Sequence, residues 1–368
     1  MALFGYFDNE VPINVPVPGD KNRLDAEMTT KISDAPCHPT QVMDPHQTYR
    51  FRVPAERLVT EITPNADIFV LAHFGIARVQ LSDWRLQISG MVSRPATLDF
   101  SDLLKFPKIE IQSFIKCAGF PADPTIATRN VSNAIWAGAD LAAVLDSVGL
   151  HSDASFIWSH GPDHGTYQNW EADCYVKDLP VDRVRPGEVL LAYEVNGEPL
   201  SPAHGFPVRL FIPGYYGTNS VKWVCRIEAS DRRAPGIFTT ELYNDPVHAL
   251  SNDAPQRTTP TWEVPPEALI VSPANRAKLS TGVISIWGWS WGATEVEFVE
   301  ISVDNGRTWS RAKTDSRKQT SWQKFQFTWK QETPGEFSIM ARATNLTGET
   351  QPDSAARNAT HKIEVVVG

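Results

Sequence analysis

A cysteine stands where an alternating apolar segment gives way to small residues, in "IEIQSFIKCAGFPADPT" (109–125). The alternation predicts a strand with one buried face. Lys116, Cys117, Ala118 and Gly119 follow it. Small residues let a backbone turn sharply and let a large group come close. The Cys117 thiol could therefore act as a soft metal ligand or a nucleophile, or it could be a small buried hydrophobe.

The common catalytic and cofactor-binding signatures are missing from the sequence. We find no GxGxxG before a helix, no P-loop, no HExxH and no GxSxG. The residues that could do chemistry are dispersed over four segments, "FVLAHFG" (69–75), "KCAGF" (116–120), "VLLAYEVNGEPLSPAHGFPVRLFIPGYYGTNSVKW" (189–223) and "FTTELYNDP" (238–246). Any shared site must be assembled from these segments by the fold.

Length and composition indicate a globular protein that is large enough for two domains. The chain has 368 residues, 42% of them hydrophobic and 21% charged, and no apolar run approaches a membrane span. The net charge of −9 disfavours nucleic acid as a partner but permits a small anionic substrate. Four cysteines (Cys37, Cys117, Cys174, Cys225) lack CxxC spacing, which argues against a zinc ribbon and a disulfide scaffold.

Residues 46–251 are expected to form a domain of mixed α and β structure. The spacing of apolar residues in 139–150 predicts a short helix that ends near a glycine. Residues 206–214 and 220–230 predict strands, and the glycines that flank the aromatic pair in 214–220 predict a turn between them. The fold class expected for this domain is α+β.

The flanking segments have different compositions. Residues 1–45 are rich in Pro, Asp and Asn and are expected to form an extended N-terminal arm, and residues 252–268 are expected to form a Pro-rich linker. Short strands at regular spacing in 269–368, with a hairpin signal at "DNG" (304–306), predict an all-β sandwich of immunoglobulin type.

The segment "AYEVNGEPLSPAHGFPVRL" followed by "SVKW" resembles the molybdenum-cofactor domain of the sulfite oxidase family, and "CAG" after a strand resembles that family's metal-ligand turn. The linker and the β-sandwich resemble the family's dimerisation domain. The resemblance covers roughly residues 45–365. It implies that Cys117 Sγ is the protein ligand to molybdenum, because a soft metal takes a thiolate, beside two pterin sulfurs and two oxygen-type ligands.

The resemblance also implies which residues hold the pterin. Arg209 and Lys222 would supply positive charge to its phosphate, and the backbone of Ser220, Val221 and Lys222 would wrap its tail. The rest of the cradle would consist of Phe69, Val70, Leu71, Ala72, His73, Asp163 and His204. Tyr243 matches the family's active-site tyrosine, whose phenol can donate to a substrate oxygen or to a ligand of the metal. Without the resemblance, each of these residues could equally be a surface charge or a packed core residue.

Two positions depart from the family. Sulfite oxidases carry an arginine within the segment matching "FVLAH" and another shortly after "CAG", where this sequence has Leu71 and Ala122. Losing two guanidiniums weakens the grip on a small oxyanion, unless Lys116, Arg129 or His164 compensates. We therefore expect weak binding of sulfite.

The resemblance implies a molybdenum-dependent oxidoreductase of sulfite oxidase type, with molybdopterin as cofactor and sulfite as substrate. Another small S- or N-oxide compound is the alternative substrate. Two other functions stay open, namely a non-catalytic β-rich assembly module and a zinc hydrolase that uses His160, Asp163 and His164. The molybdenum content of the purified protein would distinguish the enzyme from the module.

The expected partners follow from the same resemblance. No haem or flavin domain is expected in this chain, so electrons would pass to a separate acceptor. A homodimer is expected through the C-terminal domain, where Trp287, Trp289 and Trp291 share one strand face and suit a sandwich core or a dimer interface. The N-terminal residues show no basic n-region, no long apolar core and no twin Arg, so a cytoplasmic protein is expected, without nucleic acid or membrane as partner.

Overall fold

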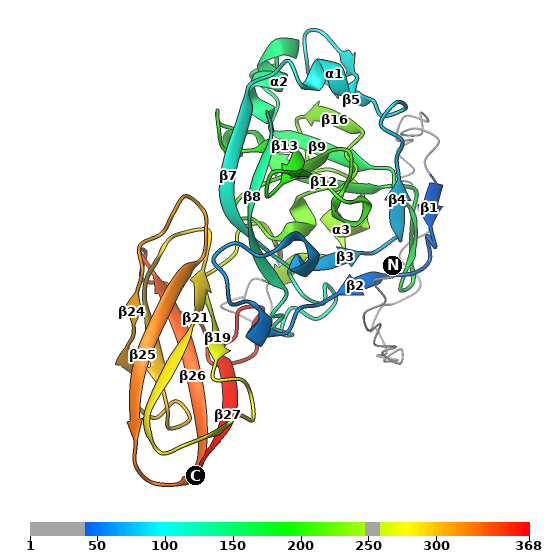
Figure 1. Ribbon diagram of the computed structural model, residues 1–368. Coiled ribbons are helices and arrows are strands. Elements are labelled where there is room, and N and C mark those ends of the chain that lie inside the picture. Colours follow the sequence, from blue (N-terminus) through cyan, green and yellow to red (C-terminus); the bar gives the residue numbers. More distant parts are fainter. Residues whose placement is uncertain (1–40, 247–257) are drawn as a thin grey trace, which may run out of the picture.

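The computed structural model describes residues 41–246 and 258–368, and strands predominate in both ranges (Figure 1). The helices of the N-terminal domain are short: α1 (Phe100–Leu103), α2 (Leu141–Val148) and α3 (Ile237–Thr240), with 3-10 turns η1 (Ala55–Arg57), η2 (Asn65–Asp67), η3 (Val181–Arg183), η4 (Pro202–His204) and η5 (Gly217–Asn219). The described N-terminal domain is thus mostly β, and the finer α+β assignment stays a prediction. None of the helices in the described ranges has the length and apolar character of a membrane span.

Two five-stranded sheets form the body of the N-terminal domain. One has the order β12-β9-β16-β5-β6, from β12 (Tyr175–Pro180), β9 (Phe156–Gly161), β16 (Arg226–Ser230), β5 (Leu86–Gly90) and β6 (Ala96–Leu98). The other has the order β14-β13-β8-β7, with β15 also paired to β13, from β14 (Glu198–Pro199), β13 (Leu190–Val195), β8 (Val131–Asp140), β7 (Lys108–Lys116) and β15 (Arg209–Phe211).

Short antiparallel pairs complete this domain. They are β1 (Gln41–Met43) with β4 (Ile76–Arg78), β2 (Tyr49–Phe51) with β3 (Val70–Ala72), β10 (Gly165–Tyr167) with β11 (Trp170–Ala172), and β17 (Asn244–Pro246) with β18 (Thr258–Pro260). Most of the predicted arm 1–45 lies outside the described residues. Residues 41–43 of the predicted arm form β1, which pairs with β4 in register Val42↔Ala77, so this part of the expected extended arm belongs to a sheet.

The strand expected before Cys117 and the helix expected within 139–150 are confirmed. β7 ends at Lys116, directly before Cys117. Helix α2 begins after Asp140, whose side chain accepts a hydrogen bond from the Ala142 amide at 3.1 Å, and ends at Gly149, whose φ of 70° only glycine adopts readily.

The strands predicted at 206–214 and 220–230 are shorter than expected. β15 spans Arg209–Phe211 and β16 spans Arg226–Ser230, while 217–219 form η5. Two backbone hydrogen bonds still join the segments, from the Leu210 amide to the Val221 carbonyl at 2.8 Å and from the Val224 amide to the Val208 carbonyl at 2.9 Å, and residues 220–222 line a cavity.

The C-terminal domain consists of two sheets that pack face to face. The first has the order β19-β21-β25-β24, from β19 (Glu267–Ser272), β21 (Gly282–Trp291), β25 (Gln323–Gln331) and β24 (Lys313–Thr314). The second has the order β20-β27-β26-β22-β23, from β20 (Lys278–Leu279), β27 (His361–Val367), β26 (Gly335–Asn345), β22 (Val296–Ser302) and β23 (Ser310–Arg311). Its immunoglobulin-type topology stays a prediction.

Two details of this domain differ from the expectation. Of the predicted linker 252–268, residues 252–257 lie outside the described residues, 258–260 form β18, and the last two residues belong to β19. The hairpin at "DNG" is present as β22–β23, but the whole segment 303–309 connects the strands.

The tryptophan face of β21 contacts the N-terminal domain. Ile284 and Ile286 point into the core between the two C-terminal sheets, while Trp289 and Trp291 belong to the core of the N-terminal domain. The Trp289 Nε1 donates to the Leu58 carbonyl at 2.7 Å. The expectation of a sandwich core or a dimer interface for this face is therefore wrong, because the face is used within the chain.

Candidate active site

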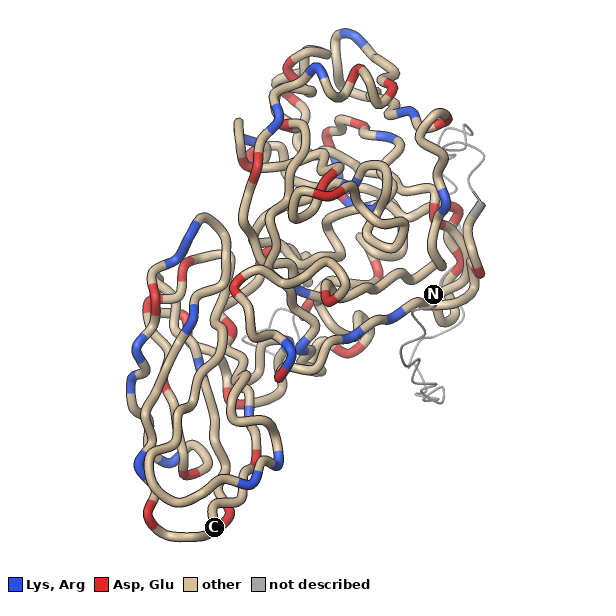
Figure 2. The backbone as a smooth tube through the Cα atoms, in the orientation of Figure 1, with Lys and Arg blue, Asp and Glu red and all other residues tan. Residues whose placement is uncertain are grey.

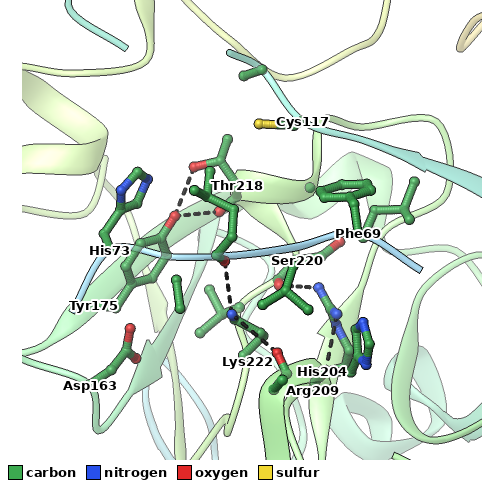
Figure 3. A pocket seen from close by; sticks show the side chains of 18 of the residues that line it. Phe69, His73, Cys117, Asp163, Tyr175, His204, Arg209, Thr218, Ser220 and Lys222 are labelled. Atoms are coloured by element: carbon green, nitrogen blue, oxygen red, sulfur yellow. Dashed lines mark hydrogen bonds between the residues drawn. The ribbon is translucent and has the colours of Figure 1, made fainter. Parts of the chain in front are cut away.

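One cavity collects all thirteen residues that the sequence analysis proposed. It encloses about 650 Å³ including its open mouth, a size typical of small-molecule sites. Its lining consists of Phe69, Val70, Leu71, Ala72, His73, Ile115, Cys117, Ala118, Asp163, Tyr175, Ala203, His204, Arg209, Gly217, Thr218, Ser220, Val221, Lys222 and Tyr243. Figure 3 shows Cys117 on one side and Arg209, His204 and Lys222 on the other.

The Cys117 thiol lies at the end of β7, where the chain turns away from the sheet. Its side chain is buried, and its amide still bonds across the hairpin to the Asn130 carbonyl at 2.9 Å. The Gly119 amide donates to Cys117 Sγ at 3.3 Å. Gly119 has φ +88°, and a Cβ there would lie 2.9 Å from the Ile126 carbonyl oxygen, so the turn requires glycine. Cys117 is a free thiol, which a soft metal could bind.

The wall that contains Phe69 to His73 is formed by β3 and the residues beside it. β3 is fixed by its pairing with β2, and the Phe69 amide donates to Ser132 Oγ at 3.2 Å. In this register Leu71 lies opposite Arg50. The backbone of this wall is therefore held on both sides before any ligand binds.

Arg209 is a buried cation that bonds only to carbonyl oxygens among the described residues. Its guanidinium donates to the carbonyls of His204 at 3.1 Å, Ser220 at 2.9 Å and Leu210 at 3.4 Å. It also stacks over Trp136, 5.2 Å from the ring centroid. Burial lowers the pKa of Arg209 to about 9. A buried charge without a counterion is costly, so an anion in this part of the cavity would stabilise it.

Lys222 is a second cation of the cavity and is half-buried. Its Nζ donates to the Leu71 carbonyl at 2.9 Å and to the Ala203 carbonyl at 3.4 Å. Burial lowers the pKa of Lys222, and the positive charge of Arg209 lowers it further. Burial raises the pKa of Asp163, while Lys222 opposes this shift. The two cations, one buried and one half-buried, outweigh the one buried carboxyl, so this part of the cavity favours an anion.

The glycine at position 205 lets two segments of this part approach each other. A Cβ at Gly205 would lie 3.0 Å from Arg209 Cβ and 3.1 Å from Lys222 Cβ, and its φ is +106°. The preceding turn η4 places His204, whose Nδ1 lies 2.8 Å from Ser201 Oγ. Burial lowers the pKa of His204 to about 4, so its imidazole is neutral at pH 7.

A histidine–tyrosine pair borders the cavity near Cys117. The Tyr243 hydroxyl lies 2.8 Å from His73 Nε2, and both side chains are buried. Burial lowers the pKa of His73 to about 3, with Lys222 and Arg50 adding to the effect, so the ring is neutral. The other ring nitrogen, Nδ1, is buried and has no hydrogen-bond partner among the described residues. It is available to a ligand in the cavity.

Several lining residues were not found from the sequence. The Tyr175 hydroxyl bonds to Thr218 Oγ1 at 2.7 Å and to its carbonyl at 2.8 Å, which fixes the turn η5 against β12. The glycines of "GYYGTNS" gave a signal for a turn near Thr218, whereas nothing around Tyr175 distinguishes it from a core tyrosine. Ile115, Ala118, Ala203 and Gly217 line the cavity as neighbours of residues that were proposed.

Of the residues considered from the sequence for the anion site, only Leu71 lines the cavity. Ala122 is exposed and lies outside the cavity lining. Of the three possible replacements, Lys116 is buried next to Glu267, and Arg129 is half-buried and bonds to the Ala359 carbonyl. The His164 ring bonds to the Pro162 carbonyl at 3.0 Å. None of the three lines the cavity, so the compensation considered from the sequence is not supported.

The zinc alternative finds no geometric support. Over residues 41–246 and 258–368, no group of three or more His, Cys, Asp or Glu side chains gathers as a metal site. His160 is buried, and its Nδ1 lies 3.9 Å from Cys174 Sγ. Cys174 is a free, half-buried thiol, whereas Cys225 is disulfide-bonded.

The chemistry of the cavity fits a bulky anionic cofactor that carries a soft metal. A thiol lies on one side, the cations Arg209 and Lys222 on the other, and an imidazole nitrogen of His73 that has no hydrogen-bond partner within the described part of the chain lines the same cavity. Charged residues elsewhere alternate in sign along both domains without a long run of one sign (Figure 2). The selective concentration of positive charge is thus a property of the cavity.

Comparisons with known proteins agree with these features. Residues 73–238 match the family model of the oxidoreductase molybdopterin binding domain, and residues 258–365 match the Mo-co oxidoreductase dimerisation domain. The chain is 30% identical to sulfite oxidase from Gallus gallus over 88% of this chain and 75% of that protein.

Two further similarities are more distant. A nitrate reductase [NADH] from Brassica napus is 28% identical over 70% of this chain and 31% of its own length. The crystal structure of the sulfane dehydrogenase SoxCD from Paracoccus pantotrophus has a TM-score of 0.72 at 23% identity, covering 98% of this chain and 92% of that one. This last similarity supports the fold.

Proposed function

Because this chain belongs to the sulfite oxidase family and is a molybdenum-dependent oxidoreductase that binds molybdopterin, we propose that it oxidises sulfite and passes the electrons to a separate acceptor. Sulfite and water would become sulfate, two protons and two electrons. The observation that carries the proposal is the free Cys117 thiol at the cavity whose other side holds Arg209 and Lys222.

The cofactor, when bound, supplies the two-electron oxygen-atom transfer, and the protein supplies position and charge. We assign Cys117 Sγ to the metal. Arg209, Lys222 and the Ser220–Lys222 backbone are assigned to the anionic tail of the pterin, because these groups combine buried positive charge with backbone donors.

The remaining cradle residues are assigned to the pterin body. Phe69, Val70, Leu71, Ala72, His73, Asp163 and His204 line the cavity between the two sides and offer flat apolar surface and polar ring atoms. The unpartnered His73 Nδ1 suits a polar atom of the pterin. The hydrogen bond between Tyr175 and Thr218 holds the turn η5 against β12.

Tyr243 is assigned to the substrate. When the neutral imidazole of His73 carries its proton on Nε2, it donates to the Tyr243 oxygen and leaves the phenol proton free for another acceptor. Burial raises the pKa of Tyr243 well above its usual value, so the phenol keeps its proton. It can then donate to an oxygen of the substrate.

A second substrate class follows from the apolar wall at Leu71. A less charged S- or N-oxide compound needs no guanidinium at this position, and a nitrate reductase is among the relatives. Competition between sulfite and such compounds in one assay would rank the two classes.

Assembly and location are also proposals. The match of residues 258–365 to a dimerisation domain supports a homodimer through the C-terminal domain. The divisions at residues 46, 252 and 269 and a cytoplasmic location stay predictions from the sequence. Sedimentation of the purified chain at micromolar concentration would test the dimer, and a monomer there would refute it.

The proposed chemistry can be tested with two cysteine variants. The protein, made in a host that synthesises the cofactor, should contain one molybdenum per chain and reduce an artificial acceptor with sulfite. Cys117→Ala should fold but lose turnover and the thiolate-to-metal absorption band, whereas Cys174→Ala, the control, removes a free thiol outside the cavity lining and should keep both.

Two results would contradict the proposal. Full turnover in Cys117→Ala would remove Cys117 from the metal site. Protein without molybdenum, from a host that loads other molybdenum enzymes, would favour an assembly module instead.

A further inference from the structure

A buried carboxylate of the C-terminal domain lies directly beneath the Cys117 turn. Glu267, the first residue of β19, places Oε1 3.3 Å from the Nζ of Lys116, the last residue of β7. Both side chains are completely buried. Neither carboxylate oxygen of Glu267 has a well-aligned hydrogen bond from the described residues. The charge of Glu267 is therefore compensated by neighbouring cations alone.

Lys116 connects this carboxylate to the backbone of the cysteine. Its Nζ also donates to the Cys117 carbonyl at 3.1 Å. The ammonium thus bridges β19 of one domain and the metal-ligand turn of the other. Removing the carboxylate would leave this ammonium buried without an anion, which is strongly unfavourable.

Arg129 approaches the same carboxylate from the far end of the loop. Loop 117–130 is closed at its base by the hydrogen bond from the Cys117 amide to the Asn130 carbonyl. Burial lowers the pKa of Arg129, and the negative charge of Glu267 opposes that shift. Its Nη2 donates to the Ala359 carbonyl of the C-terminal domain at 3.2 Å. Arg129 thus ties the far end of the loop to the C-terminal domain.

A second side chain of the C-terminal domain holds the turn itself. Arg357 Nη1 donates to the Ala118 carbonyl at 2.6 Å, while its other donors bind the Asp245 carboxylate at 2.7 to 2.9 Å. Two consecutive carbonyls, those of Cys117 and Ala118, thus accept hydrogen bonds from cations that the domain interface holds in place. Figure 1 shows β7 running toward the C-terminal domain.

We propose that Glu267 is a positioning residue for the molybdenum centre: through Lys116 it locks the base of loop 117–130 and so fixes the Cys117 sulfur at the cavity. The C-terminal domain is then part of the metal site's support as well as a candidate dimerisation domain. The buried carboxylate also offsets the positive charge next to the metal ligand.

Two consequences follow from this arrangement. Loss of the carboxylate should loosen the turn, so the buried Cys117 thiol should become more accessible. Loss of its charge leaves positive charge unbalanced near the metal, and this favours the metal's reduced form. Neither consequence is expected from a residue that only stabilises the interface.

The test uses the full chain and the variant Glu267→Gln, which keeps the shape of the side chain and removes its charge. Glu300→Gln is the matched control, because Glu300 pairs with Arg342 at 2.9 Å between β22 and β26, within the C-terminal domain. The first measurement is the alkylation rate of Cys117 in cofactor-free protein at one pH. Cys174 in the same molecule is the internal reference.

Glu267→Gln should raise the Cys117 alkylation rate severalfold relative to Cys174, and Glu300→Gln should not. In the loaded protein, Glu267→Gln should shift the reduction potential of the metal upward, and Glu300→Gln should leave it unchanged. Native values in Glu267→Gln for both measurements, or equal changes in the two variants, would overturn the positioning role.

A double variant keeps the test decisive if Glu267→Gln does not fold. Lys116→Gln with Glu267→Gln restores the net charge but breaks the bridge to the Cys117 carbonyl. We expect a near-native potential together with faster alkylation. An unchanged alkylation rate in this variant would overturn the proposal.

The inference rests on the proposed role of Cys117, and the two can fail separately. Alkylation of cofactor-free protein reports on the turn alone. Retention of full turnover by Cys117→Ala would disprove the ligand role, whatever the alkylation result shows.

Discussion

The hydroxyl oxygen of Tyr243 lies 2.8 Å from Nε2 of His73, and both residues line the cavity that Cys117 borders. The two residues are 170 positions apart in the chain. Tyr243 has a φ of 57°, a conformation that non-glycine residues adopt at a cost. The fold therefore holds this phenol in a specific place, next to an imidazole that is neutral at pH 7.

Removing the phenol oxygen should mainly affect turnover. Tyr243→Phe keeps the ring but loses the donor, so we expect kcat/KM for the substrate to fall roughly 100-fold. Molybdenum content should be unchanged. Tyr167→Phe is the control, because Tyr167 packs edge-on against His73, 4.4 Å between centroids, and lies outside the cavity lining. Equal activity of the Tyr243→Phe variant and the native protein would exclude Tyr243 from the reaction.

The position of Leu71 predicts weak use of sulfite and a way to improve it. Leu71→Arg places a guanidinium at the cavity wall, and a charged hydrogen bond of this kind should lower the KM for sulfite roughly 10-fold. The new charge lies opposite Arg50 on β2, so some stability, about 0.2–1 kcal/mol, should be lost.

Ala122→Arg is the comparison for this change. Ala122 is exposed outside the cavity, so its replacement should leave the KM for sulfite unchanged. Steady-state sulfite oxidation with an artificial acceptor measures both variants. A micromolar KM for sulfite in the native protein would show that the sulfite site lies elsewhere. So would a KM for sulfite that changes in Ala122→Arg but not in Leu71→Arg.

The tryptophan contact between the domains should contribute strongly to stability. Trp289 stacks on Trp322 with 4.6 Å between centroids and donates to the Leu58 carbonyl at 2.7 Å. Trp289→Ala should destabilise the protein by about 3–5 kcal/mol because it removes a buried indole. Trp309→Ala, where the indole is half-buried against Arg342, should cost much less. Urea denaturation measures the free energy of unfolding of both variants. Similar losses of stability in the two variants would contradict a core shared by the two domains.

His160 should make stability depend on pH. Burial, aided by Arg226, lowers its pKa from 6.5 to about 3 in the folded state. Between these values the unfolded chain binds the proton more readily, so the contribution of the neutral ring is lost as the pH falls below 6.5. The free energy of unfolding attributable to His160 should fall by about 2 kcal/mol between pH 7.5 and pH 5.

The difference in the free energy of unfolding between the native protein and His160→Gln separates this contribution from those of the other titrating groups. The difference should change by that amount when urea denaturation is repeated at the two pH values. A difference that does not vary with pH would mean that His160 is not held neutral.

The sequence by itself determined the local elements around Cys117 and thirteen of the residues that line the cavity. Alternation in 109–115 and the small residues after Cys117 predicted a strand followed by a turn, because both depend on neighbouring residues. Capping by Asp140 and Gly149 likewise defined α2. The cavity residues were found through the order of four segments that resemble one family, since no local pattern relates positions so far apart.

Only the tertiary structure decided which faces meet. The alternation of β21 showed that Trp289 and Trp291 share a face, but the partner of that face is set by packing between domains. The pairing of Lys116 with Glu267 joins residues 151 positions apart, and no local signal distinguishes Glu267 from a surface carboxylate. Burial changes the energetic effect of such a residue, because a charge that is well solvated in water needs a counterion once the solvent is excluded.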